Sequence, residues 1–482
     1  MYRDQTVKER TDVERPIHLR YVAFLATTAA LGGLLFGFDI AIITGAGPFI
    51  TREFDLSDLS LGWAFSSLLF GCVIGSFVTG RITDRYGRRR LLLIVAILFA
   101  ITSTATALAG NFTLFVLARF LGGIAVGAVS LLSPMYVAEV APASIRGRLG
   151  AVYQLSIITG VCISYVINYL LRATGPNNWR WMFLTGVLPS AVFFFLMLLA
   201  PETPRFLALH GRKKEALAVF DRIGGPQSPE SLLAEIAATA HSEERTWSRL
   251  LRPGVRRALA VSAGLAILIH VSGINTVIDF APIIFQSAGW KLEGALASTL
   301  MVGLVELIFT IASLWMIDRF GRKPLYIWGS LGMAVCLLAL VASVLLGRFE
   351  GMLVLTLILA YLAFFAACIG PVFWTLVPEI FPNRVRSEAM IVPVMVQWIA
   401  NAIAVLFFPW AVTVLGKGLT FFFLCAMALA QMLFTWRFVP ETKGKTLEEI
   451  ESMWDGHVAN GNVRPLMSKP EMPLEPQPTN RR

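Results

Sequence analysis

Charged residues are scarce in this chain. Asp, Glu, Lys and Arg make up only 15% of its 482 residues, whereas a soluble domain of ordinary composition carries about 25%. Hydrophobic residues account for 56%, and the mean hydropathy is +0.68. This composition excludes an ordinary soluble enzyme and an intrinsically disordered protein.

Cysteine and histidine are also few, with five of each. The cysteines, at positions 72, 162, 336, 368 and 425, lie in apolar stretches, form no CxxC motif and have no cluster of histidines beside them. This pattern argues against a disulfide framework and a metal site, and we interpret the cysteines as small buried hydrophobic residues. Nucleotide motifs and nucleophile constellations are missing as well, so neither an enzyme nor an organic cofactor is expected.

The charges that are present follow a membrane pattern. The chain has 41 Lys and Arg against 31 Asp and Glu, a net charge of +10 that alone would suit nucleic acid. Most of the basic residues, however, occur in short runs between long apolar blocks, as in the loops of a membrane protein. The predicted partner is therefore a lipid bilayer and not a nucleic acid.

Twelve apolar stretches are long enough to cross a bilayer, which takes about 20 mainly apolar residues. They span residues 21–49, 61–80, 91–110, 112–138, 149–171, 181–200, 258–287, 295–317, 324–347, 351–377, 387–415 and 418–438. The sequence thus predicts an all-α membrane protein with twelve transmembrane helices. The first stretch is too long for a cleavable signal, and the 20 residues before it carry five basic and four acidic side chains.

The loops predict the orientation and the domains. Loops after even-numbered helices hold 22 Lys and Arg, and those after odd-numbered helices hold 6. Because cytoplasmic loops are enriched in basic residues, both termini are expected on the cytoplasmic side of the cell membrane. The predicted parts are a tail (1–20), a bundle (21–200), a linker of short amphipathic helices (201–257), a second bundle (258–438) and a tail (439–482), disordered after about residue 456.

The two bundles are repeats of each other. DRYGRR at 84–89 recurs as DRFGRK at 318–323, an offset of 234, and PET at 201–203 recurs at 440–442, an offset of 239. Glu139 and Arg146 recur as Glu379 and Arg386 at offset 240, and GFD at 37–39 faces GIN at 273–275 at offset 236. Four motifs in one order indicate two six-helix pseudo-repeats, which in many transporters enclose a site at the bilayer midplane.

These motifs also resemble those of a known family. The chain is similar to the sugar porters of the major facilitator superfamily, a group that includes proton-coupled xylose symporters and glucose facilitators. The resemblance covers about residues 20–450 and rests on GRITDRYGRR at 80–89, PETPR at 201–205, PEIFP at 378–382 and PETKG at 440–444. It implies the major facilitator fold, alternating access and a small sugar-like substrate.

Five ionisable residues lie inside predicted spans, namely Asp39, Arg119, His270, Asp279 and Glu306. A charge at the bilayer centre costs about 2.5–3.5 kcal/mol on insertion scales, so such residues indicate function.

Asp39 and Arg119 lie about 15 and 10 Å from the outer ends of their helices, at 1.5 Å per residue. The family resemblance implies that these two helices face each other and that the residues pair. Protonation of Asp39 would break the pair and free Arg119, which would couple a proton to a rearrangement of the first half. A static pair that only joins the helices is the alternative. Asn275 is the equivalent of Asp39 in the second half and cannot titrate.

A cytoplasmic gate follows from the resemblance. Its predicted residues are Asp84, Arg85, Arg88, Arg89, Glu139, Arg146, Glu202, Arg322, Glu379 and Arg386, with Glu441 as a further candidate. Salt bridges among them would interlock the two halves when the site faces out. Positive-inside topology alone is the alternative, and it explains the arginines but not the repeated glutamates.

The resemblance also implies a sugar pocket. The matching positions are Phe36, Gln154, Asn275, Gly370, Trp374, Gln397, Trp398 and Asn401. Amides supply donors and acceptors to hydroxyl groups, and a tryptophan face covers the apolar side of a pyranose. For any one of these residues alone, helix packing would be the better interpretation.

The chain departs from the family in helices 7 and 8. The family usually has Gln-Gln before Gly-Ile-Asn and Tyr-Tyr after it, and Asn in helix 8. Here Ile269-His270 precedes the motif, Asp279-Phe280 follows it, and Glu306 replaces the helix 8 Asn. We expect His270, Asp279 and Glu306 to border the substrate cavity. Three roles are open to them: they accept hydrogen bonds from substrate hydroxyls, they bind a cationic group of the substrate, or they form a second protonation site. The alternative is that one of the carboxylates faces the solvent in the outer vestibule and contributes little to transport.

Together these features predict a symporter, functional as a monomer, that imports a monosaccharide or polyol with a proton as coupling ion. A transporter of an amino sugar or other charged metabolite and an uncoupled facilitator are alternatives. A transporter-like sugar sensor is the alternative from another class.

Overall fold

The computed structural model describes residues 16–142, 144–225, 228–242, 253–381, 385 and 389–443. These residues form helices joined by turns, without a β-strand among them. Twelve helical segments of the described chain are long and apolar enough to cross a membrane, which confirms the predicted number of spans. Arg386 and both ends of the chain, including the predicted disordered tail, lie outside the described residues.

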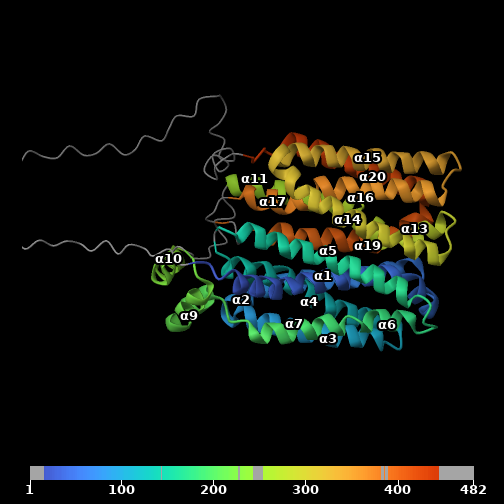
Figure 1. Cartoon of the computed structure of the whole chain (residues 1–482). Coiled ribbons are helices and arrows are strands. Elements are labelled where there is room, and N and C mark those ends of the chain that lie inside the picture. Colours follow the sequence, from blue (N-terminus) through green and yellow to red (C-terminus); the bar gives the residue numbers. More distant parts are fainter. Residues whose placement is uncertain are drawn as a thin grey trace, which may run out of the picture.

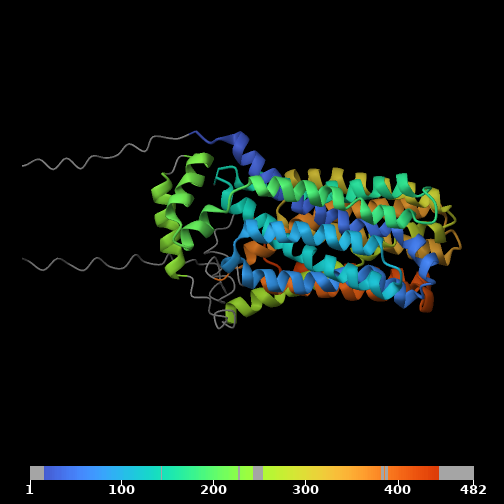
Figure 2. The ribbon, with the colours of Figure 1, turned by 90° about the horizontal axis from the view of Figure 1, so that it is seen from below.

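The N-terminal half consists of seven helices. They are α1 (Leu19–Phe54), α2 (Asp58–Tyr86), α3 (Arg88–Ala107), α4 (Phe112–Val140), α5 (Arg146–Leu171), α6 (Asn178–Leu184) and α7 (Val187–Leu199). The predicted amphipathic linker follows as α8 (Pro204–Leu209), α9 (Lys213–Ile223) and α10 (Pro229–Ser242). The last two project beyond one end of the bundle, which we call the linker end (Figures 1 and 2).

The C-terminal half repeats this plan with more interruptions. Its helices are α11 (Pro253–Val271), α12 (Ile274–Asp279), α13 (Ala281–Ser287), α14 (Leu292–Phe320), α15 (Arg322–Leu345), α16 (Gly351–Cys368), α17 (Gly370–Ile380), α19 (Ile391–Val414) and α20 (Gly416–Phe438). In Figure 1 this half, yellow to red, lies above the N-terminal half, blue to green. The helices α6 and α13 lie toward the end opposite the linker, which we call the far end.

Glycines allow the helices of one half to approach closely. A Cβ atom at Gly71 of α2 would lie 2.1 Å from the carbonyl oxygen of Phe120, and one at Gly123 of α4 would lie 1.9 Å from that of Leu68. Small residues spaced four apart permit such backbone contact between membrane helices. Across the two halves, α2 packs against α19 and α5 packs against α14.

Three predicted spans are broken instead of continuous. The span at 181–200 is divided between α6 and α7, the span at 258–287 among three helices, and the span at 351–377 between α16 and α17. In the second of these, Gly273 has φ +95°, a conformation that favours glycine, and Pro282 lies in the first turn of α13. Interrupted backbone inside a membrane is tolerated where it is buried in protein or borders a cavity. Two of these breaks adjoin the cavity described next.

Candidate functional site

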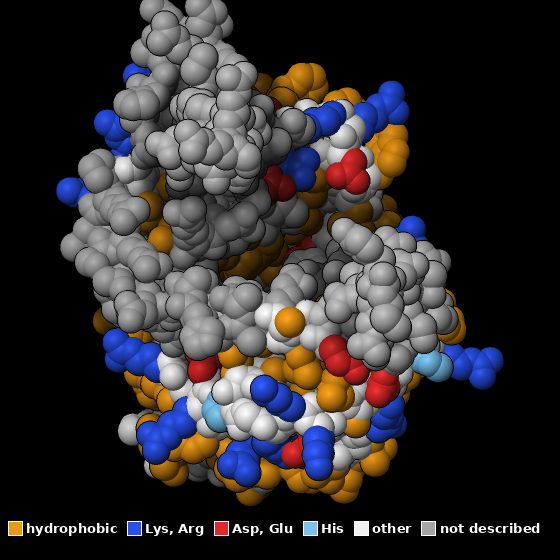
Figure 3. Space-filling view, turned by 90° about the vertical axis from the view of Figure 1, so that its left-hand side faces the viewer, with side chains coloured by type: hydrophobic (Ala, Val, Ile, Leu, Met, Phe, Trp, Pro, Cys, Tyr) orange, Lys and Arg blue, Asp and Glu red, His pale blue; other side chains and the backbone are white. Residues whose placement is uncertain are grey.

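A cavity of about 570 Å³ lies between the two halves. Its walls come from α1, α4 and α5 on one side and from α11, α12, α14, α16, α17 and α19 on the other. It includes Gly147 near the start of α5 and Ile317 near the end of α14, so it extends toward the linker end. Figure 3 looks onto that end and shows a hollow with largely apolar walls between the halves.

Ten of the eleven predicted substrate residues line this cavity. They are Phe36, Gln154, His270, Asn275, Glu306, Gly370, Trp374, Gln397, Trp398 and Asn401. Their part in binding stays a prediction, but segments up to 365 residues apart in sequence meet at one site. His270 and Asn275 lie on either side of the break at Gly273, and Gly370 begins the second half of another broken span.

Asp279 is the exception: it does not line this cavity in the state described here, and its part in binding stays a prediction. It is buried at the end of α12, one turn beyond Asn275, and is not among the lining residues. The neighbouring Phe280 stacks on Phe65 of α2, with ring centroids 4.4 Å apart. The Asp279 carboxylate interacts electrostatically with Arg119 and Tyr165.

Several polar atoms at the cavity are buried without a hydrogen-bond partner among the described residues. They are both ring nitrogens of His270, Oε1 of Gln397, Nε1 of Trp398 and both amide atoms of Asn401. Buried polar groups in native proteins are nearly always hydrogen-bonded to protein or water, so these atoms are available to bond to water or to a polar ligand in the cavity. Phe36 packs edge-on against Trp398, with ring centroids 5.8 Å apart, and adds an apolar surface.

The predicted contact between Asp39 and Arg119 is present. Nη1 of Arg119 donates to Oδ1 of Asp39 at 2.7 Å, and Nη1 and Nη2 both donate to the Asp39 carbonyl oxygen at 3.1 Å. Arg119 is 2% exposed and Asp39 is 8% exposed. Phe183 of α6 lies under the guanidinium, 5.3 Å from its Cζ to the ring centroid. The pair therefore joins α1 to α4, next to Phe36 and Ile40 of the cavity wall.

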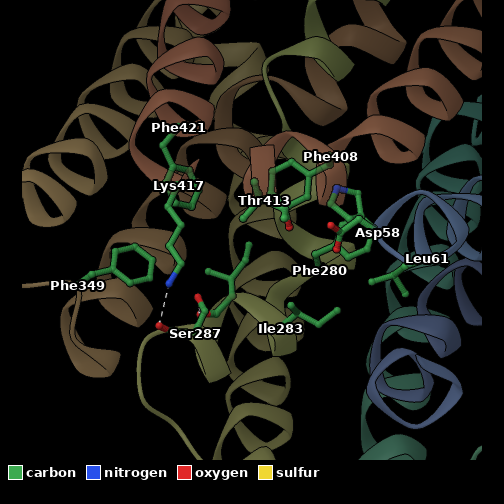
Figure 4. A pocket seen from close by; sticks show the side chains of 13 residues that line it. Asp58, Leu61, Phe280, Ile283, Ser287, Phe349, Phe408, Thr413, Lys417 and Phe421 are labelled. Carbon is green, nitrogen blue, oxygen red and sulfur yellow. Dashed lines mark hydrogen bonds between the residues drawn. The ribbon is translucent and has the colours of Figure 1, made fainter. Parts of the chain in front are cut away.

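The far end is closed by contacts that the sequence analysis missed. Phe280 also stacks on Phe408 of α19, at 5.4 Å, and Arg172, the residue after α5, forms an ion pair with Glu293 of α14. Figure 4 shows Phe280 and Phe408 in a small pocket of the far end, where Lys417 donates to the Ser287 carbonyl oxygen at 3.0 Å. None of these residues belongs to one of the repeated motifs. The phenylalanines also do not stand out, because the surrounding sequence is apolar throughout.

At the linker end the predicted gate residues of the N-terminal half pair with one another. Arg88 contacts Glu139 at 3.0 Å and Asp84 at 3.1 Å. Glu202 accepts hydrogen bonds from the backbone N–H groups of Arg88 and Arg89 at 3.0–3.1 Å, and so caps the first turn of α3. Arg85 lies against the ring of Tyr86.

The C-terminal half repeats this cluster. Arg322 contacts Glu379 at 2.8 Å, and Glu441 accepts from the backbone N–H groups of Arg322 and Lys323 at 3.2 and 3.0 Å. Thr442 donates to Glu379 at 2.5 Å. The side chain of Arg146 is outside the described part. The gate ion pairs Arg88–Glu139, Arg88–Asp84 and Arg322–Glu379 thus each lie within one half.

The chain also matches known proteins. The model of the family "Sugar (and other) transporter" matches residues 25–454. The arabinose-proton symporter of Bacillus subtilis is 36% identical over 449 residues, covering 92% of this chain and 97% of the relative. The D-xylose-proton symporter of Escherichia coli K12 is 37% identical over 473 residues, covering 90% and 96%.

Solved structures agree with these sequence matches. The inward open conformation of the xylose transporter XylE from E. coli has a TM-score of 0.80 and 34% identity, covering 90% of this chain and all of that chain. The same major facilitator superfamily protein bound to 6-bromo-6-deoxy-D-glucose has a TM-score of 0.77 and 36% identity, covering 90% and 99%. The chain is therefore a multi-pass membrane protein of the sugar transporter family, built on the major facilitator fold.

Proposed function

We propose that this protein is a proton-coupled symporter that imports a monosaccharide or polyol by alternating access. The observation that carries the proposal is the buried Arg119–Asp39 pair beside a cavity lined by amide and tryptophan side chains. The names of its relatives, which include arabinose-proton and D-xylose-proton symporters and a major myo-inositol transporter, support the same substrate class.

The coupling step takes place at Asp39. Its carboxylate is the counter-charge of a guanidinium that is almost completely buried, and removing one partner of such a pair costs about 3–5 kcal/mol. When Asp39 takes a proton, the charge-assisted bond from Nη1 is lost, and Arg119 must find other acceptors. Proton binding is thereby linked to the packing of α1 against α4 and α6.

Alternating access uses the two ends in turn. In the state described here the far end is closed by the Phe65–Phe280 stack and the Arg172–Glu293 pair, and the cavity extends toward the linker end. In the opposite state, the charged clusters around Glu139 and Glu379 meet across the halves and close the linker end. Partly exposed ion pairs contribute only about 0–1 kcal/mol each, which lets such a gate open.

The remaining assignments follow from the same proposal. The linker end and both termini face the cytoplasm, as the excess of Lys and Arg in the loops of that end indicates. The protein acts as a monomer in the cell membrane, carries no catalytic activity and uses the proton as its coupling ion. Among the described residues, no group of three or more His, Cys, Asp or Glu side chains is placed to hold a metal ion.

Transport by purified protein in proteoliposomes tests the proposal. A panel of labelled pentoses, hexoses and polyols is offered under an imposed proton gradient and, separately, in counterflow without a gradient. Wild-type protein should accumulate at least one compound, whereas Asp39→Asn should lose accumulation and keep counterflow. The matched control is Asp55→Asn, the same chemical change at an exposed position after α1. Undiminished accumulation by Asp39→Asn, or no exchange of any compound by wild type, would overturn the proposal.

A further inference from the structure

One charged side chain, Glu306, faces the cavity. Among the described residues that line it, Glu306 is the only Asp, Glu, Lys or Arg; the others are apolar, amide, hydroxyl, indole or imidazole side chains. Glu306 lies midway along α14, so its carboxylate is near the centre of a membrane span. The formal charge of the cavity wall therefore comes from one carboxylate.

No Lys or Arg of the described chain pairs with this carboxylate. Within the described chain, Glu306 forms neither an ion pair nor a hydrogen bond. One turn earlier, Gly303 packs against α5, where Cys162 Sγ donates to its carbonyl oxygen at 3.3 Å. Glu306 interacts electrostatically with Cys162 and Tyr165, and Tyr165 also interacts with a second carboxylate, Asp279. Arg119 is already engaged by Asp39, so it does not neutralise Glu306.

An unpaired carboxylate inside a membrane protein is costly, and such residues normally have a partner. A partner can reach this carboxylate through the cavity, whose aromatic walls suit a positive group. Phe36, Trp374 and Trp398 present ring surfaces there, and indole and phenyl faces attract cations. A carboxylated sugar, by contrast, would meet a like charge and no arginine or lysine among the described residues of the cavity wall.

We propose that the preferred substrate carries a protonated amine, as an amino sugar or an amino polyol does. The ammonium group donates to Glu306, while the hydroxyl groups bond to the unpartnered atoms of Gln397, Asn401 and His270. This inference rests on the proposed transport function and adds the substrate class. It accounts for Glu306 and for the buried polar atoms with a single ligand.

Four compounds that share one pyranose ring test the preference for a protonated amine. They are D-glucosamine, N-acetyl-D-glucosamine, D-glucose and D-glucuronate. Their affinities for the purified protein are measured by isothermal titration calorimetry, and their uptake is measured in proteoliposomes. Glucosamine should bind at least about tenfold more tightly than glucose, the size of a charge-assisted contact in a desolvated site. Acetylation removes the charge and should remove the gain, and glucuronate should bind most weakly.

Variants connect the preference to the carboxylate. The readout is the ratio of the glucosamine affinity to the glucose affinity. A general loss of folding lowers both affinities and leaves this ratio unchanged. The glutamine of Glu306→Gln still bonds to hydroxyl groups, so only the contribution of the charge is removed. Glu306→Gln should bring the ratio to about one, and Glu306→Asp should keep glucosamine ahead. Glu350→Gln, at an exposed glutamate before α16, is the control and should keep the wild-type ratio.

The outcomes separate the two claims. If wild type binds glucose as tightly as glucosamine, or if Glu306→Gln keeps the full preference, the inference is overturned while a neutral-sugar symporter stands. If none of the four compounds is bound and no member of the sugar and polyol panel is transported, the proposed function fails as well.

Discussion

Replacing Gly62 by alanine should shift the protein away from the state described here. Gly62 of α2 lies against the backbone of α19, where the two halves meet. A Cβ atom at Gly62 would be 1.9 Å from the carbonyl oxygen of Leu406 and 2.8 Å from its carbonyl carbon. Ordinary contact begins at 3.4 Å, so the two helices would have to separate by about 1.5 Å. Both contacting groups are on the backbone, so a side-chain rotation cannot relieve the clash.

We expect this clash to raise the free energy of the state described here. Overpacking in a well-packed interface costs about 1–3 kcal/mol. Because α2 and α19 touch in this way when the far end is closed, the alanine variant should favour the state in which that end is open. At about 1.4 kcal/mol for a tenfold change, the ratio of the two states should move by roughly five- to 150-fold.

Cysteine labelling measures this shift. Ile284 of α13 lies behind the closed far end and is 6% exposed, so Ile284→Cys reports its opening in a background whose native cysteines are replaced. A membrane-impermeant maleimide added from the far side should react with Cys at position 284 faster when Gly62→Ala is also present than when Gly62 is retained. Gly110→Ala is the control, because no atom lies within 4 Å of a Cβ atom there. Equal labelling rates in Gly62→Ala and the control would refute the reasoning.

Three further predictions follow from the described contacts. Glu202→Gln weakens the cap on the first turn of α3 and should lower stability by about 1 kcal/mol, seen as a lower Tm in a thermal unfolding assay; an unchanged Tm would count against the cap. Asp279→Asn should leave the apparent KM in counterflow within about twofold of wild type, since Asp279 does not line the cavity, and a large rise would restore it as a binding residue. Raising the external pH should slow gradient-driven uptake by wild type, because Asp39 must take its proton from that side; in Asp39→Asn, counterflow should not respond to pH, and a parallel response would place the titrating group elsewhere.

The topology and one contact were predictable from the sequence. A bilayer core requires every backbone group to bond internally, so long apolar stretches there must be helices, and twelve such stretches give twelve spans. The Asp39–Arg119 contact was predicted from the depths of the two residues and from the family resemblance, and the structure confirms that they meet.

Other features depend on information that the sequence does not display. The breaks near Gly273 and Ile369 lie within apolar runs, so hydropathy alone joins the pieces. The Phe65–Phe280–Phe408 stack uses residues that look like any lipid-facing or core phenylalanine. The repeated glutamates do signal ion pairs, but whether Glu139 and Glu379 pair within a half or across halves depends on the conformational state. In the state described, they pair within each half.

Proton movement on addition of sugar shows whether Asp39 couples proton entry to sugar entry. Proteoliposomes holding wild-type protein and a trapped pH-sensitive dye are given, without any imposed gradient, the compound that the transport panel identifies. The lumen should acidify as the compound enters, and Asp39→Asn should exchange the compound without acidification. Sugar entry into wild-type vesicles with no change in the internal pH would contradict this coupling.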